Sequence, residues 1–229
     1  MFKWLRQKWK PSTKKASLTA LAKPLDLSQL RKRAKIVVID DDSNAFPVNI
    51  LQNEGYTIEQ WDEVKSLDRL ERGDFDIIVL DIAGVAKKLT GSDGLGILKH
   101  LKQANPSQVV VAFSGQSFDI GKTEFFQLAD DTLAKPVDAL KCKQVLDHLI
   151  QSKLSVEHLW QSIVAALKKE NVADSSIRSL ETQICRAIAQ GESAGFEATI
   201  KGIVERHDLV LRIAGVLVKI AGLCTTSAG

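Results

Sequence analysis

The sequence predicts an α/β fold, a doubly wound parallel sheet followed by an all-α region. Three observations support this prediction. Short runs rich in β-branched residues are bounded by polar residues, which is typical of strands buried on both faces of a parallel sheet. Helical patterns lie between these runs, and no strand pattern appears after about residue 150. In such a sheet, ligand chemistry is expected at the carboxyl ends of the strands.

Five short segments are predicted as strands. The first, third and fourth are continuous apolar runs, and the second and fifth are weaker patterns that complete a plausible sheet. Repeated alternation with helices implies right-handed crossovers and helices on both faces. In chain order the predicted strands are 36–39, 56–60, 77–80, 109–113 and 131–134.

Three helices are predicted between these strands. The first covers 45–54, where Pro47 fits a first turn and Gly55 ends the helix. The second covers 62–72, and the third covers 94–104, each with apolar residues at helical spacing.

The last third of the chain predicts a helical domain with four helical stretches. Two strongly amphipathic stretches cover 156–167 and 177–188, and a shorter one covers 194–205. Residues 208–223 are apolar nearly all round but carry Arg212 and Lys219. Because this stretch is shorter than 18 residues, a buried helix or an oligomer contact is favoured over a membrane span.

Composition and charge divide the chain into three parts. Of its 229 residues, 45% are hydrophobic and 26% charged, an ordinary globular mixture that argues against disorder or a polytopic membrane protein. Residues 1–33 hold ten Lys/Arg and one acid, residues 34–150 twelve and nineteen, and the rest nine and eight. Three scattered cysteines argue against a disulfide scaffold. We therefore expect a basic arm and linker at 1–33, an acidic α/β domain at 34–152 and a helical domain at 153–229.

The start of the arm, MFKWLRQKWKP, places aromatic and aliphatic residues beside lysines at helical spacing. Such a segment suits weak contact of residues 1–15 with an anionic membrane surface. Nucleic acid, an acidic partner, the chain's own acidic domain and a solvated tail stay open as alternatives.

Polar residues follow four of the predicted strands. Asp40, Asp41 and Asp42 end the first strand, Asp81 ends the third, Ser114 follows the fourth and Lys135 the fifth. Crowded carboxylates need a counter-ion, and a hard cation such as Mg²⁺ suits oxygen ligands. A carboxylate can then attack phosphorus while a hydroxyl and an ammonium hold the phosphoryl oxygens. The plainer alternatives are helix caps, a turn aspartate, a loop hydroxyl and a surface lysine.

The combination of motifs resembles the response-regulator receiver domain of two-component phosphorelays over residues 34–152. The matching motifs are KIVVIDDD, DFDIIVLDI, SDGLGILKHLK, VVVAFSG and LAKPV. The resemblance implies a flavodoxin-like sheet in the order 2-1-3-4-5.

The resemblance also implies a role for each site residue. Asp81 corresponds to the phosphoacceptor, and the donor is a sensor histidine kinase or a phosphotransfer protein. The bond before Pro136 is expected to be cis. Mg²⁺ is expected as the cofactor, with Ser114 and Lys135 beside the phosphoryl group. The implied metal ligands are Asp40, Asp41, Asp81 and the backbone carbonyl of Ala83.

Two features depart from the receiver pattern. The position three residues before the lysine usually carries Tyr or Phe as a rotamer switch, and here it is Thr132. The loop after Asp81 is long, with thirteen residues from Asp81 to Gly94, and it contains Lys87 and Lys88. These departures motivate a second hypothesis, a scaffold protein that uses the receiver fold for docking without switching.

The leading hypothesis is a cytoplasmic or membrane-peripheral phosphorelay response regulator, a phosphoacceptor with self-dephosphorylation at most, rather than a metabolic enzyme. Phosphorylation is expected to change contacts of the face around 115–135 with the tail or a partner. The helical tail, 153–229, is expected to form homo-oligomers or to dock a partner protein. Its nearly neutral charge argues against a DNA-binding regulator, the third hypothesis.

Overall fold

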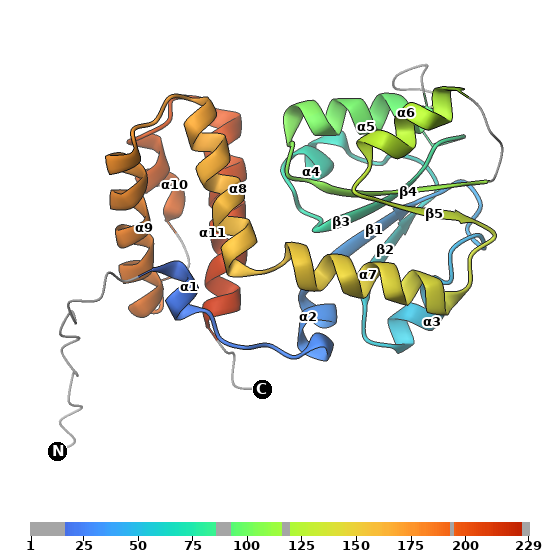
Figure 1. The fold of residues 1–229 in the computed structure, drawn as a ribbon, viewed down its shortest axis with the longest axis horizontal. Coiled ribbons are helices and arrows are strands. Elements are labelled where there is room, and N and C mark those ends of the chain that lie inside the picture. The colour runs from blue at the N-terminus through green and yellow to red at the C-terminus, as the bar shows by residue number, and fades with distance from the viewer. Residues whose placement is uncertain (1–16, 86–92, 116–119, 193–194, 226–229) are drawn as a thin grey trace.

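A five-stranded parallel sheet forms the centre of the first domain. The computed structural model describes residues 17–85, 93–115, 120–192 and 195–225. The strand order is β2-β1-β3-β4-β5, and every neighbouring pair is parallel, which confirms the predicted fold class (Figure 1). The strands are β1 (Lys35–Ile39), β2 (Thr57–Trp61), β3 (Ile77–Asp81), β4 (Val109–Gly115) and β5 (Asp131–Lys135).

Helices cover both faces of this sheet, as a doubly wound topology requires (Figure 1). One face carries α3 (Val48–Asn53) and α7 (Ala139–Lys153), and the other carries α4 (Leu67–Glu71), α5 (Asp93–Ala104) and α6 (Ile120–Leu128). Alternate residues of the central strands are buried in the two cores.

Some helices differ from their predicted bounds. The helix expected over 62–72 begins only at Leu67, because the Ser66 side chain accepts a hydrogen bond from the Arg69 N–H and caps it there. The helix expected over 45–54 begins at Val48, after Pro47. The helix α7 had no counterpart among the predicted elements, although Asp138 caps it.

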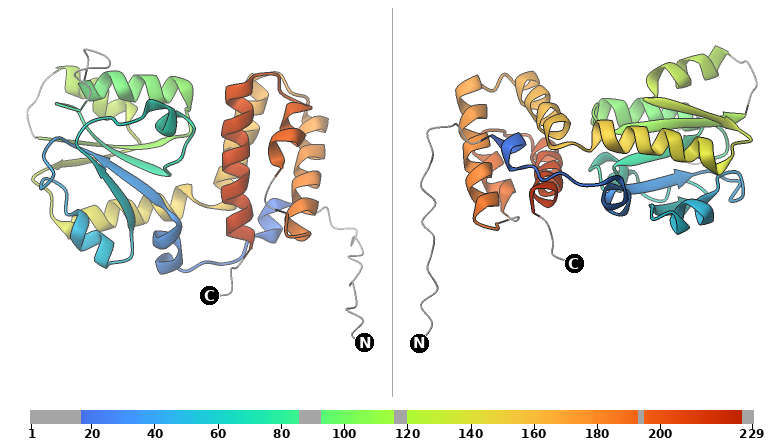
Figure 2. Two further views of the ribbon diagram at one scale, coloured as in Figure 1. Left: turned by 180° about the vertical axis from the view of Figure 1, so that it is seen from behind. Right: turned by 60° about the horizontal axis from the view of Figure 1, so that its bottom comes forward.

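The C-terminal part is a bundle of helices with its own core, confirming the predicted all-α region. Its helices are α8 (Val156–Lys169), α9 (Asp174–Ala189), α10 (Phe196–Lys201) and α11 (His207–Cys224). Figure 2 shows that α11 faces the sheet domain and that α9 lies on the far side. The apolar residues of α11 pack into the bundle core, whereas its cations Arg212 and Lys219 contact the sheet domain. In the described part of the chain, no helix combines the length and apolarity that crossing a membrane requires.

Residues 17–33, expected to be linker, contain two short packed helices. Leu18 of α1 (Leu18–Leu21) is fully buried in the core of the helical bundle. The second helix, α2 (Leu27–Arg33), starts with a capping box between Asp26 and Gln29 and packs against the sheet domain. The expected membrane-contacting segment, residues 1–15, lies outside the described residues.

Candidate functional site

Three carboxylates meet at the carboxyl edge of the sheet. Asp81 is the last residue of β3, and Asp40 and Asp41 directly follow β1, which pairs with β3 through Ile39 and Leu80. Ligand atoms of the three side chains all lie within 4.8 Å of one another. The parallel register therefore brings together the acidic residues that the sequence placed at two strand ends.

Lys135 joins two of these carboxylates. Its Nζ lies 2.7 Å from Oδ2 of Asp40 and 2.8 Å from Oδ2 of Asp81. It also lies 4.8 Å from the centre of the Phe113 ring, which supports it through a cation–π contact. The expected cis bond between Lys135 and Pro136 is present. A surface lysine in solvent is thus not what the structure shows.

The pKa values of Asp40 and Lys135 both lie above their ordinary values, for different reasons. Asp40 is 0% exposed, and burial raises the pKa of its carboxyl group, although Lys135 and the Asp42 N–H oppose the rise. Burial lowers the pKa of Lys135, but hydrogen bonds and charges from Asp40 and Asp81 outweigh it, so its pKa lies above the usual value. The pKa of Asp40 is therefore raised by burial against the effect of Lys135, whereas the pKa of Lys135 is raised by its two carboxylate partners against the effect of burial.

The cluster fits a hard divalent cation. The Asp40 Oδ2 atom is buried and has no aligned hydrogen bond within the described residues, although it pairs by charge with Lys135 at 2.7 Å. Asp41 is exposed and turns its carboxylate towards Gly84, where an added Cβ would lie 2.0 Å from Asp41 Oδ2. Three carboxylates, each of which offers one oxygen atom within 4.8 Å of the others, match the ligands that Mg²⁺ prefers. The structure thus brings together three of the four predicted metal ligands.

The backbone around Asp81 is tightly packed. The Ile82 N–H donates to Asp81 Oδ1 at 2.7 Å, and the Gly94 N–H donates to the Ile82 carbonyl at 2.8 Å. A Cβ on Gly94 would lie 2.1 Å from the Asp81 carbonyl oxygen, so only glycine fits in this first turn of α5. Sequence reasoning gave Gly84 and Gly94 no such role. For Gly94, the sequence signal was its place in the SDG motif of the receiver pattern.

Ser114 and Ala83 occupy the expected positions along the chain. Ser114 is buried on β4, one residue beyond Phe113, which is the register partner of Asp81. Among the described residues, its Oγ makes one long contact, 3.5 Å to the Gly115 carbonyl oxygen. Ala83 lies in the loop two residues after Asp81, and the liganding role of its carbonyl stays a prediction.

The departures from the receiver pattern have different outcomes. Thr132 is exposed on the edge strand β5, and its N–H is bonded to Asp131 Oδ1 at 2.7 Å. Lys87 and Lys88, in the long loop, lie outside the described residues.

The alternative that Asp40 and Asp41 cap the following helix is wrong, because α3 begins after Pro47 without a side-chain cap.

Comparison with protein families gives one match. Residues 36–147 match the family model described as the response regulator receiver domain. No curated protein matches the chain.

Solved structures with similar folds include a CheY-like receiver domain protein from Methanospirillum hungatei JF-1, with 21% identity and a TM-score of 0.44 over 52% of this chain and 95% of that one. The receiver domain of NtrX from Brucella abortus has 24% identity and a TM-score of 0.43 over 51% and 98% of the two chains. A longer NtrX chain from the same organism has 25% identity and a TM-score of 0.46, covering 66% of this chain and 34% of that one.

Proposed function

Because residues 36–147 form a response regulator receiver domain, we propose that Asp81 accepts a phosphoryl group from the phosphohistidine of a sensor kinase or a phosphotransfer protein. The observation that carries this proposal is Lys135, which lies within 2.8 Å of both Asp81 and Asp40 at the carboxyl edge of the sheet. An ammonium in this position can pair with the carboxylate of Asp81 before transfer and with the oxygens of the attached phosphoryl group afterwards.

The residues of the site support one transfer step. A carboxylate oxygen of Asp81 forms a bond to phosphorus while the phosphorus–nitrogen bond of the donor breaks, and the imidazole keeps the electron pair. Lys135 and the hydroxyl of Ser114 donate hydrogen bonds to the phosphoryl oxygens as charge develops on them. Asp40, Asp41, Asp81 and the Ala83 carbonyl would hold Mg²⁺, which would neutralise part of that charge. The product is an acyl phosphate on Asp81, and the proposed role of the protein is therefore signalling rather than metabolic catalysis.

The phosphoryl group is proposed to act through protein contacts in the cytoplasm. The helical tail, which follows α7, is proposed to dock a partner protein or a second copy of the chain. The near-neutral tail gives no electrostatic basis for DNA binding. Weak contact of residues 1–15 with an anionic membrane stays a prediction from the sequence.

A phosphorylation assay tests the central step. The protein is incubated with a radiolabelled small-molecule acyl phosphate, with and without Mg²⁺. We expect labelling that requires Mg²⁺ and disappears in Asp81→Asn. Asp42→Asn is the matched control, because Asp42 is an exposed neighbour outside the carboxylate cluster, and it should retain labelling. Label that persists in Asp81→Asn removes the assignment.

A second candidate function is a docking scaffold that does not switch, and the exposed Thr132 favours it, since no aromatic ring occupies that position. This candidate predicts the same labelling but no change in partner binding. A pull-down with and without an acyl-phosphate mimic separates the two. Equal recovery of partners in both arms supports the scaffold.

A further inference from the structure

The helical bundle is held on the sheet domain by cations of α11. Lys219 Nζ lies 2.7 Å from Asp76 Oδ1 and donates to the Gly73 carbonyl at 2.8 Å. The Asp76 side chain is only 6% exposed, so this ion pair is sheltered from solvent. Gly73 lies just beyond the end of α4, where helix carbonyls concentrate partial negative charge.

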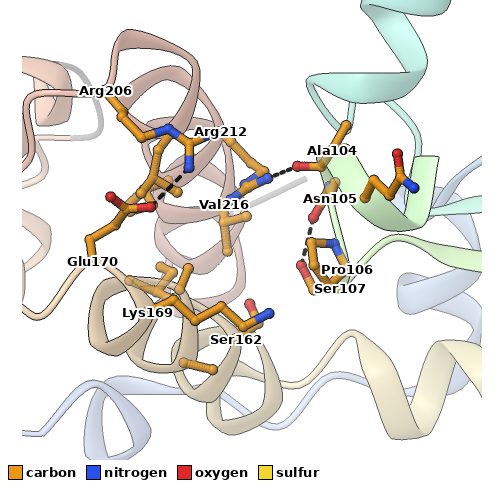
Figure 3. A pocket seen from close by; sticks show the side chains of 16 residues that line it. Ala104, Asn105, Pro106, Ser107, Ser162, Lys169, Glu170, Arg206, Arg212 and Val216 are labelled. Atoms are coloured by element: carbon orange, nitrogen blue, oxygen red, sulfur yellow. Dashed lines mark hydrogen bonds and ion pairs between the residues drawn. The ribbon is translucent and has the colours of Figure 1, made fainter. Parts of the chain in front are cut away.

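Arg212, two turns earlier on α11, makes a second contact of the same kind. Its guanidinium donates to the carbonyl of Ala104, the last residue of α5 (Figure 3). Within the described residues it forms no ion pair, so its partner is the negative end of α5. Arg33 of α2 contacts the Gly222 carbonyl of α11 in the reverse direction. We refer to the contacts that these three cations, Lys219, Arg212 and Arg33, make with their partners as the α11 clasp.

Two receiver elements lead from the clasp to the carboxylate cluster. Asp76 directly precedes β3, and Asp81 is the last residue of that strand. The helix α5 starts against the Asp81 backbone at Gly94 and ends at the clasp with Ala104. Five strand residues span roughly 17 Å, and twelve helical residues span about 18 Å. The same two elements therefore have the phosphoacceptor at one end and the tail at the other.

The clasp ends of these two elements are also joined to each other. The Gln108 side-chain amide donates to the carbonyls of Phe75 and Asp76, at 3.2 and 3.3 Å. Lys102, in the last turn of α5, donates to the Gln108 carbonyl at 2.8 Å. We therefore expect a shift of α5 to reach the start of β3 and the contacts of Lys219 and Arg212 in the clasp.

We propose that the α11 clasp restrains β3 and α5, so that occupancy of the Asp81 site and docking of the helical tail are energetically coupled. The first turn of α5 lies so close to the backbone of Asp81 and Ile82 that a Cβ at Gly94 would clash with it, and we therefore expect a displacement of this backbone to move α5. The clasp opposes that movement, and by linkage a released tail favours occupancy of the site. This inference rests on the proposed function of Asp81. It places the coupling at the amino end of the sheet, away from the 115–135 face expected from the sequence.

Binding of beryllofluoride with Mg²⁺, an acyl-phosphate mimic, tests the coupling in the full chain by isothermal titration calorimetry. The variants are Lys219→Met and Arg212→Met, and circular dichroism verifies that each is folded. The matched control is Lys201→Met, which removes an exposed lysine that pairs with Glu197 inside the tail. Arg212→Met keeps the test valid if loss of the Asp76 partner unfolds the other variant, because the Arg212 partner is an uncharged carbonyl.

We expect both clasp variants to bind the mimic about five-fold more tightly or better than wild type, with wild-type affinity in Lys201→Met. Unchanged or weaker affinity in Arg212→Met overturns the coupling while leaving the proposed function intact. If wild type binds no mimic at all, the proposed function fails as well, so the two failures are distinguishable.

Discussion

At the scale of single residues, Asp40 combines a function with a cost in stability. Its carboxylate is fully buried, and burial raises its pKa even though Lys135 lies beside it. A buried charge is expensive unless its partners compensate fully. Lys135 divides its charge between Asp40 and Asp81, so the compensation of Asp40 is incomplete.

We therefore expect Asp40→Asn to raise the free energy of unfolding by about 1 kcal/mol at neutral pH without Mg²⁺, while Mg²⁺ binding is lost. The amide oxygen can still accept the Asp42 N–H that Asp40 Oδ1 accepts. Because the pKa of Asp40 is raised by folding, its contribution to stability is present in acid and is lost as pH rises through the folded pKa. The advantage of the variant should therefore grow from acidic to neutral pH.

Urea unfolding at several pH values measures this difference. Asp42→Asn provides the control, since Asp42 is exposed, and its stability should stay close to that of wild type. A variant less stable than wild type at neutral pH would show that the ion pair outweighs the burial of Asp40.

At the scale of elements, α2 is attached to the sheet domain by a partly buried polar network as well as by its apolar residues. Arg31 donates to both oxygens of Asp147 on α7, and the hydroxyl of Tyr56 donates to the same carboxylate. Arg31 also lies over the Tyr56 ring at 5.0 Å. Burial tends to raise the pKa of Asp147, but its hydrogen bonds from Arg31 and Tyr56 hold it below the usual value.

Removal of the arginine should leave the partly buried carboxylate of Asp147 without this cation. We expect Arg31→Met to lower the free energy of unfolding by about 2 kcal/mol at neutral pH, and Lys32→Met, an exposed neighbour, to change it little. Because folding lowers the pKa of Asp147, its carboxylate stabilises the fold at pH values above its unfolded-state pKa. The stability lost in Arg31→Met should therefore become smaller as the pH falls through the folded-state pKa of Asp147. Urea denaturation curves of the two variants measure this difference, and equal midpoints at neutral pH would show that the Arg31–Asp147 pair contributes nothing to stability.

The elements differ in how far the sequence could predict them. Val37, Val79 and Val111 lie in continuous apolar runs, so the strands and their order followed from pattern and resemblance. The helix α1 has four residues, too few for any periodic pattern, and its position depends on a core formed by distant helices. For α2, the capping box of Asp26 and Gln29 was a local signal within a lysine-rich stretch.

At the scale of the whole molecule, residues 17–33 bridge the two domains. α1 packs on the helical bundle and α2 on the sheet domain (Figure 2). Leu18 is fully buried, and its N–H donates to Glu181 of α9 at 3.3 Å. The bundle core is therefore completed by a side chain from the other end of the sequence.

Leu18→Ala should destabilise the helical bundle by about 2 to 4 kcal/mol, through lost burial and a residual cavity. Thr19→Ala, an exposed neighbour on the same short helix, is the matched control. Hydrogen exchange resolved by segment can locate the effect, with faster exchange expected in α9 and α11 and little change in the central strands. Exchange that rises equally in both domains would contradict a local role for α1.

The site and the clasp also differ in predictability at this scale. Asp40, Asp81 and Lys135 follow strands, and the carboxyl ends of parallel strands share one edge, so topology alone brings them together. No comparable sequence signal marks Lys219 and Asp76, because their contact depends on how the helical bundle packs against the sheet domain. The sequence predicted a buried α11 but not the carbonyls that its cations contact.

The placement of Leu18 also has a consequence for the order of synthesis. Its partner Glu181 lies 163 residues later in the chain, and other members of its core, including Ile220, follow later still. During translation the sheet domain can fold while Leu18 has no surface to pack on, because α9 and α11 have not yet been made. Leu18, the first buried residue in the described part of the chain, is thus among the last to reach its final position.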